Sequence, residues 1–422
     1  MPVPAPARTR RPLLSTRTAF WVQACVLVVL MAASSAPSPL YPVYQQLWGF
    51  PPVVLTVIFA AYVLALLAAL LTVGSLSDHL GRRPVLLTAL GVEIVAMVVF
   101  ATADGPTALV VARVVQGLAT GAAIGTLGAY LIELEHAVHP GLGTVLNGAG
   151  PALGLALGAV ASSLVVAAAP GAVHLIYLVL LAVLVAQVVA TALGPETARR
   201  QPGALASIQP RVAFPPATRR SAAWVLPATV ATWSLGGLIL SLGPSLVRSM
   251  AGSDAVVLTG LVVAALTGTG GVTTLLLGSM RPARTLALGM VALLAGMAGT
   301  LVALATGSVG LYFAVTIVAG VGFGAGFLGV LRTLLPQAAT HQRAGLLSAI
   351  YVVSYLANSV PAVAAGALTG RIGLLPTARG YTCMVIALAL FVLVGLVARA
   401  RSAPRAQQSR SADDDPGAAR EG

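Results

Sequence analysis

The sequence predicts an all-α membrane protein with twelve transmembrane helices, arranged as two pseudo-symmetric bundles of six. Three observations lead to this prediction: the composition, the number of long apolar segments, and a repeat between the two halves. Hydrophobic residues make up 58% of the 422 residues and charged residues only 8%. A soluble domain carries roughly a quarter charged residues. The composition therefore excludes an ordinary soluble domain.

Twelve segments are long and apolar enough to cross a bilayer, which requires about 20 mostly apolar residues. They are residues 18–40, 52–74, 84–103, 106–133, 142–168, 172–194, 221–247, 254–278, 284–305, 308–335, 344–370 and 377–399. The first follows a basic stretch and resembles a signal peptide, but Pro37 disfavours cleavage, so we expect an uncleaved first helix.

The arginines predict the orientation of these helices. The net charge is +13, and all 24 basic residues are Arg. With the N-terminus inside, 19 of them fall in cytoplasmic segments, and only Arg248, Arg371 and Arg379 fall outside. The positive-inside rule then places both termini in the cytoplasm and the chain in the inner (plasma) membrane of the cell. Because the arginines lie between apolar spans, the lipid bilayer explains them and no nucleic-acid partner is expected.

The predicted organisation has five parts. They are a cytoplasmic tail (1–17), a six-helix bundle (18–194), a Pro- and Arg-rich linker (195–220), a second bundle (221–400) and a disordered cytoplasmic tail (401–422). The bundles repeat at an offset of 203 residues. The matches are Val53-Val54-Leu55-Thr56 with Val256-Val257-Leu258-Thr259, and Gly117 and Gly121 with Gly320 and Gly324.

A short basic loop joins the second and third spans. It contains Gly74, Leu76, Asp78, Gly81, Arg82 and Arg83. We expect Gly74 and Gly81 to allow close backbone approach and a left-handed turn, and the arginines to hold the loop in water. The spacing Gly-x-Leu-x-Asp-x-x-Gly-Arg-Arg resembles the signature of the major facilitator superfamily, with His79 where that family usually has Arg. The resemblance implies a gating loop between two six-helix bundles around a central cavity.

Two charged residues within the spans, Arg113 and Glu93, are candidates for a functional role. Arg113, Gln116 and Gly117 resemble a second signature of the family, Arg-x-x-Gln-Gly, which implies a role in proton coupling. A charge at the bilayer centre costs at least about 2.5–3.5 kcal/mol, so Arg113 should face a polar cavity or a partner; the alternative is an Arg that snorkels to the outer interface. Glu93 lies about 14 Å deep at 1.5 Å per residue. It is a candidate proton site, or else a neutral carboxyl that only holds helices together.

Gly150, Pro151 and Gly154 of the fifth span resemble a third signature, Gly-Pro-x-x-Gly-Gly, which marks the drug:proton antiporter branch; Leu155 replaces its last Gly. Proline removes a backbone hydrogen bond and bends a helix, while glycines admit a neighbouring helix closely. The resemblance implies a bend that prevents leak.

Other polar residues have weaker interpretations. A His/Glu group after the fourth span, containing Glu133, Glu135, His136 and His139, lacks a closed ligand set. We expect interface contacts there, with Arg332 or Arg343, and no metal. Polar and aromatic candidates for the cavity or for interface belts are Tyr41, Tyr44, Gln45, Gln46, Trp48, Tyr130, Trp233, Tyr351, Tyr355 and Asn358. The absence of Lys excludes a Walker-type phosphate loop.

These features predict a protein that is not an enzyme and needs no cofactor. The resemblance implies a monomeric secondary transporter that moves small lipophilic molecules out of the cell in exchange for protons. An uptake permease or an uncoupled facilitator for a small metabolite, in the same fold, remains the alternative. A membrane enzyme or sensor would require catalytic His, Asp or Glu pairs within the spans, and the spans contain almost none.

Overall fold

The structure is a computed structural model that describes residues 13–169, 171–252 and 256–413. Within these residues twelve helical segments are long and apolar enough to cross a membrane, which confirms the predicted number, and no strand is present. Eight helices form the first half: α1 (Thr16–Ser35), α2 (Tyr41–Trp48), α3 (Pro52–Val73), α4 (Leu76–Leu80), α5 (Arg82–Ala101), α6 (Pro106–Leu134), α7 (Leu142–Ala168) and α8 (Leu175–Leu193). The linker contains α9 (Ala204–Ser207). The second half consists of α10 (Pro216–Ser241), α11 (Gly243–Ala251), α12 (Val256–Leu276), α13 (Pro282–Thr306), α14 (Val309–Leu334), α15 (Arg343–Ile372) and α16 (Leu374–Asp413).

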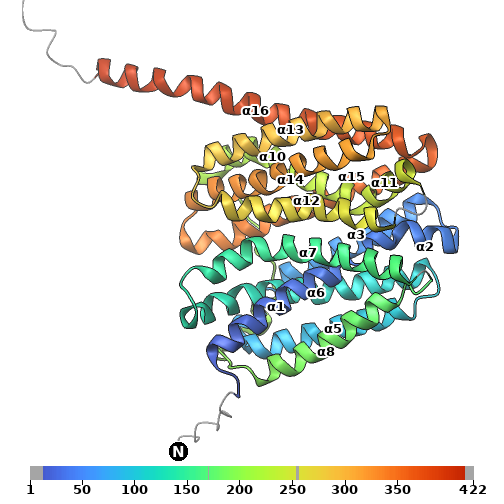
Figure 1. Cartoon of the computed structure of the whole chain (residues 1–422). Coiled ribbons are helices and arrows are strands. Elements are labelled where there is room, and N and C mark those ends of the chain that lie inside the picture. Colours follow the sequence, from blue (N-terminus) through green and yellow to red (C-terminus); the bar gives the residue numbers. More distant parts are fainter. Residues whose placement is uncertain (1–12, 170, 253–255, 414–422) are drawn as a thin grey trace, which may run out of the picture.

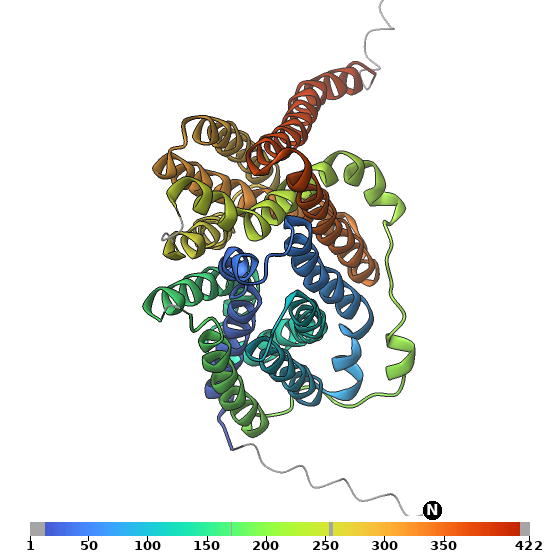
Figure 2. The same cartoon turned by 90° about the vertical axis from the view of Figure 1, so that its right-hand side faces the viewer.

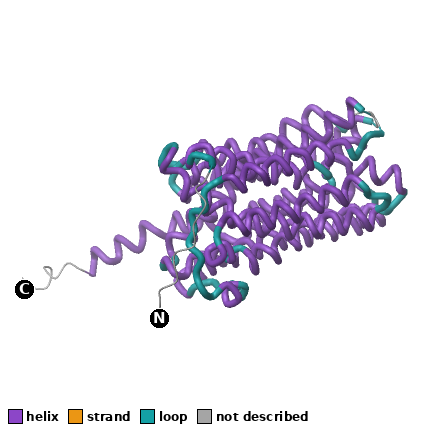
Figure 3. The backbone as a smooth tube through the Cα atoms, turned by 90° about the horizontal axis from the view of Figure 1, so that it is seen from below, coloured by secondary structure: helices purple, strands orange, loops and turns teal. Residues whose placement is uncertain are grey.

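The helices form two bundles that lie side by side (Figure 1). The bundles meet where α7 packs against α12 and where α3 packs against α15. The start of α1 and the end of α16 lie at the same end of the molecule (Figure 3), and we call it the terminal end. The linker with α9 passes along one side from the first bundle to the second (Figure 2). The other end, which holds α2 and α11, is called the opposite end.

Proline sets the start of several spanning helices. Pro52, Pro106, Pro216 and Pro282 stand in the first turn of α3, α6, α10 and α13. The first N–H groups of a helix have no partner inside the helix, so proline costs nothing there and its fixed φ favours the first turn. The long apolar runs that follow leave α-helix as the structure that satisfies every backbone group within lipid.

The repeat between the halves is visible in the helix packing. In the first half a Cβ on Gly117 or Gly121 would collide with the backbone of α3. In the second half a Cβ on Gly320 or Gly324 would collide with the backbone of α12 in the same way. Because glycine lets two helix backbones approach closely, the matched glycines fix the same helix pair in both bundles.

Two sequence expectations need correction. Gly74 has φ −54°, an ordinary helical value, so only Gly81, with φ 105°, provides a left-handed turn. Gly74 instead allows close approach, since a Cβ on Gly125 would lie 3.1 Å from its carbonyl oxygen. The C-terminal tail is also not disordered throughout, because α16 continues to Asp413 in a stretch rich in the helix formers Ala, Arg and Gln; residues 414–422 lie outside the described part.

Candidate functional site

A hydrogen-bonded network is buried in the first bundle around Arg113 of α6. The side chain of Arg113 is 1% exposed. Its Nη1 donates to the Ser34 carbonyl and to Gln116 Oε1, both at 2.7 Å, and its Nε donates to the Tyr41 hydroxyl at 2.9 Å. The guanidinium carbon also lies 5.1 Å from the centre of the Tyr62 ring. Arg113 therefore has partners within the bilayer, and the snorkelling alternative is wrong.

The partners on α1 exist because that helix ends inside the bundle. The last carbonyls of a helix have no N–H four residues ahead to bond to. Pro37 has no N–H, so the carbonyl of Ala33 is left free, and it accepts from Gln116 Nε2 at 3.1 Å. The next carbonyl, that of Ser34, accepts from Arg113. Arg113 and Gln116 thus cap the end of α1 across the bundle.

Glu93 of α5 closes the network. It is fully buried, and its Oε1 accepts from Gln116 Nε2 at 3.0 Å, while its Oε2 has no partner among the described residues. Gln116 therefore connects the carboxyl of Glu93 to the guanidinium of Arg113. The three residues that the sequence singles out as coupling candidates form one network, and Tyr41, a mere cavity candidate in the sequence, is a member of it.

The loop between α3 and α5 holds a second network, centred on Arg82. The guanidinium of Arg82 forms an ion pair with Asp78 and another with Glu133 of α6, with Nη2 2.8 Å from Oε1. Its Nη1 also donates to Ser77 Oγ at 2.8 Å. Planar Arg suits this arrangement because its fork of donors can bind two carboxylates at once.

The expected role of the His/Glu group is wrong. Glu133 pairs with Arg82, not with Arg332 or Arg343, whose side chains donate to backbone carbonyls of Leu277 and Ala338. The cause is that the end of α6 lies beside the Gly81 turn of its own bundle. No group of three or more His, Cys, Asp or Glu that could hold a metal occurs in the described part of the chain.

The linker completes this network through Glu196, which the sequence reading missed. Its carboxylate accepts from the backbone N–H groups of Arg82 at 2.8 Å and of Arg83 at 3.1 Å. An acidic group stabilises the positive N-terminal end of a helix, so Glu196 caps α5. A Cβ on Gly81 would lie 2.7 Å from the Glu196 carboxylate, which explains a glycine there.

The other linker contacts bind the same loop. His79 Nδ1 lies 3.1 Å from the Pro202 carbonyl, Ser75 Oγ donates to the Ser207 carbonyl at 2.9 Å, and Arg83 Nη1 donates to the Gly194 carbonyl at 3.1 Å. All these partners come from the first bundle or the linker. The loop is thus tied down within its own half of the molecule.

The glycines of α7 face α1. A Cβ on Gly154 would lie 2.6 Å from the Val28 carbonyl oxygen, and one on Gly150 would lie 3.1 Å from Leu27 Cδ2. Gly158, one turn further, lies closest of the three to α1, at Ala32. Pro151 stands inside α7, which continues as one helix from Leu142 to Ala168. The predicted close packing is present, and Gly158 belongs to it although it lies outside the recognised motif.

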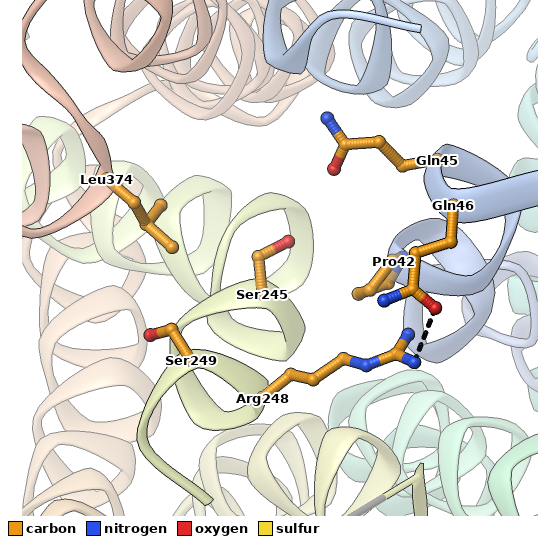
Figure 4. A pocket seen from close by; sticks show the side chains of 7 residues that line it. All are labelled: Pro42, Gln45, Gln46, Ser245, Arg248, Ser249 and Leu374. Carbon is orange, nitrogen blue, oxygen red and sulfur yellow. Dashed lines mark hydrogen bonds between the residues drawn. The ribbon is translucent and has the colours of Figure 1, made fainter. Parts of the chain in front are cut away.

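The opposite end contains a polar cavity of about 410 Å³ between α2, α11 and the start of α16 (Figure 4). Its lining is Pro42, Gln45, Gln46, Ser245, Arg248, Ser249 and Leu374. Arg248 Nη2 donates to Gln46 Oε1 at 2.7 Å, and on the neighbouring α12 Thr259 Oγ1 donates to the Pro39 carbonyl at 3.2 Å. Between described residues these are the two hydrogen bonds that join the bundles directly, so the bundles are bonded at the opposite end.

Comparison with known proteins gives the same fold. The nucleoside transporter NupG is 12% identical with a TM-score of 0.67, over 89% of this chain and 99% of that one. The human organic anion transporter MFSD10 is 16% identical with a TM-score of 0.62, over 90% and 100%. The E. coli xylose transporter XylE, in a partially occluded inward open conformation, is 14% identical with a TM-score of 0.68, over 89% and 96%. The family model described as Major Facilitator Superfamily matches residues 23–360. With twelve spans in two bundles and its signature loop in place, the chain belongs to the major facilitator superfamily of transporters.

Proposed function

We propose that this transporter exports small lipophilic molecules in exchange for protons. The observation that carries the proposal is the burial of Glu93, which has one amide partner, no direct cation and a free Oε2. A charged carboxyl without a cation costs far more free energy in apolar surroundings than a protonated one. Glu93 can therefore take up and release a proton as its access to water changes. Gln116 connects Glu93 to Arg113, so the hydrogen bonds of Arg113 would change when Glu93 gains or loses a proton.

The proposed mechanism is alternating access by rocking of residues 18–194 against residues 221–400. Substrate and protons are carried in turn, because each binding event favours the orientation of the bundles that it fits better. We place the terminal end in the cytoplasm of a monomer in the plasma membrane, on the strength of the arginine distribution. The loop network around Arg82 would then stabilise the first bundle at the cytoplasmic face during rocking.

The first test concerns Glu93. We expect Glu93→Gln to remove substrate-driven proton flux from liposomes that contain a trapped pH dye, because glutamine keeps a hydrogen-bonding oxygen for Gln116 but cannot exchange a proton. Passive substrate movement down its gradient should continue. Glu135→Gln is the matched control, since Glu135 lies outside the network and accepts from the Gly143 N–H at 2.9 Å. Normal proton flux in Glu93→Gln would refute the role of Glu93.

The second test concerns the loop. Asp78→Asn and Glu133→Gln should both slow transport several-fold without loss of membrane insertion, because each removes one of the two carboxylates on Arg82. Glu133→Gln should be slower, because Glu133 is the less exposed of the two, with 31% against 57% of its side chain accessible. The control is Asp104→Asn, an exposed acid at the opposite end. Equal initial rates in all three variants would exclude a role for the ion pairs in gating.

An uptake permease or an uncoupled facilitator is the second candidate, and the three transporters named above, for a nucleoside, an organic anion and xylose, keep it open. Substrate movement in inside-out vesicles separates the candidates. An exporter accumulates substrate in such vesicles when their interior is acidic. A permease that takes substrate up with protons would instead release it.

A further inference from the structure

Four aromatic rings of the second bundle form a closed group, which we call the aromatic quartet: Trp233 of α10, Phe327 of α14, and Tyr351 and Tyr355 of α15. The Trp233 ring makes edge contacts with Phe327 and Tyr355, with centroids 5.2 and 4.9 Å apart. Tyr351 lies 6.4 Å from Phe327 and 6.0 Å from Tyr355. Each ring keeps part of its surface accessible.

The quartet lies at the boundary with the first bundle. Its helix α15 packs against α3, and α3 packs in turn against α6, the helix of Arg113. Tyr62 of α3 is the residue whose ring lies under the Arg113 guanidinium. The helix α3 thus connects the helix of Tyr351 and Tyr355 to the network that contains Glu93.

Hydrogen bonds and a close helix contact fix the position of the quartet. Asn358 Nδ2 donates to the Trp233 carbonyl at 3.1 Å, and Ser234 Oγ donates to the Ala357 carbonyl at 3.0 Å. Gly237 lets α10 touch the backbone of Asn358, since a Cβ there would collide with it. These contacts hold α10 and α15, and hence three of the four rings, in a fixed relation.

The polar groups of the quartet have no hydrogen-bond partner among the described residues. The hydroxyls of Tyr351 and Tyr355 bond to no described residue, and they are not sealed in the interior as the Tyr312 hydroxyl is. The indole N–H of Trp233 has no acceptor among the described residues, but it is buried as the Tyr312 hydroxyl is. The two phenol hydroxyls are therefore the groups suited to a ligand that brings hydrogen-bonding atoms on its edge.

Formal charge is missing around the quartet. The only acidic residue between 197 and 412 is Asp254, which lies outside the described residues. The arginines at the ends of α14 and α15 and in α16, Arg332, Arg343 and Arg379, donate to backbone carbonyls. Glu93 and Arg113 of the first bundle are buried, with exposures of 0% and 1%. A charged ligand would lose its hydration without gaining an opposite charge.

We propose that the aromatic quartet is the substrate-binding face, and that it takes uncharged, flat, ring-bearing molecules with hydrogen-bonding atoms on the ring edge. The proposal rests on the proposed export of small molecules and specifies their class. Ring stacking supplies the affinity, and the free phenol hydroxyls select for the polar edge. Recognition then belongs to the second bundle and proton exchange to the first, with α3 in contact with both α15 and α6.

The test uses one ring in three charge states: quinoline-3-carboxamide, quinoline-3-carboxylate and N-methylquinolinium-3-carboxamide. Binding to the full chain in nanodiscs is measured by saturation-transfer-difference NMR, with empty nanodiscs subtracted. We expect saturable binding of the neutral carboxamide, at least about tenfold tighter than either charged form. Stacking on one aromatic side chain is worth about 1–3 kcal/mol, so Tyr355→Ala should raise the Kd about tenfold.

Variants keep the result interpretable. Tyr355→Phe and Tyr351→Phe retain the rings and should raise the Kd only a few-fold, and Tyr312→Phe, a buried tyrosine of the same bundle, should leave it unchanged. Three outcomes would overturn the proposal: a charged form that binds as tightly as the carboxamide, a Kd insensitive to all quartet variants, or no saturable binding of any form. The assay needs no proton gradient, so its result is separate from that of the proton-flux test. Binding without substrate-driven proton flux would refute the coupling and keep the site.

Discussion

Arg113→Lys should abolish proton-coupled transport while the protein still inserts into the membrane. Lysine carries its three N–H donors on a single nitrogen, which cannot span the Tyr41 hydroxyl, the Ser34 carbonyl and Gln116 as the separate nitrogens of the planar guanidinium do. Hydrogen bonds to charged groups contribute about 1.5–3 kcal/mol each. Losing two of them would cost about 3 kcal/mol or more and would release the end of α1. Substrate-driven proton flux in liposomes is the measurement.

The control for Arg113→Lys is the same substitution at an exposed site. Arg371 lies near the end of α15 at the opposite end of the molecule and is exposed, so Arg371→Lys should transport as the natural chain does. If Arg113→Lys kept its proton flux, the buried network would serve only to pack the helices, and Arg113 would have no role in proton coupling.

Gly158→Val should lower the thermal stability of the protein and slow transport. A Cβ on Gly158 would overlap the backbone of Ala32, whose carbonyl carbon and Cα lie 2.5 Å from its position. Extra atoms in a packed contact cost about 1–3 kcal/mol, and here they would push α1 away from α7 and move the carbonyls that hold Arg113. The melting temperature in detergent, measured with a thiol-reactive fluorescent dye or by size-exclusion chromatography after heating, checks the expected loss of thermal stability.

Gly91→Val separates this contact from the general cost of valine in a helix. Gly91 lies in α5, and a Cβ there meets no atom within 4 Å. Both variants lose a glycine from a spanning helix, and only Gly158→Val forces two helices apart. Equal melting temperatures for the two variants would show that the α1–α7 contact adjusts freely.

Much of the fold could be predicted from the sequence because the bilayer restricts the possibilities. Long apolar runs fix the number of spans, and the family signature of the Gly74–Arg83 loop indicates how they assemble. The repeat of Gly117 and Gly121 at Gly320 and Gly324 also indicated which helix positions pack closely. Each of these glycine contacts involves one helix pair, and the repeat of the glycines in the two halves makes the contact visible in a single sequence.

The partners of the site residues could not be predicted in the same way. Glu133 and Glu196 lie 51 and 114 residues from Arg82 in the chain, and no local pattern relates them. A stronger signal was available for Gln116. Pro37 leaves a helix carbonyl without a donor inside the membrane, so a polar side chain elsewhere in the bundle must supply one. The sequence contains few such side chains, and Gln116 is among them.

The two hydrogen bonds between the bundles, Gln46 with Arg248 and Thr259 with Pro39, contribute to the free-energy difference between the two orientations of the bundles. The bond between Thr259 and the Pro39 carbonyl contributes about 0.5–1.5 kcal/mol, and the bond from the charged Arg248 to Gln46 contributes about 1.5–3 kcal/mol. Together they change the ratio of the two orientations of the bundles by at least about thirtyfold. A ligand must therefore bind the other orientation at least about thirtyfold more tightly to offset these two bonds.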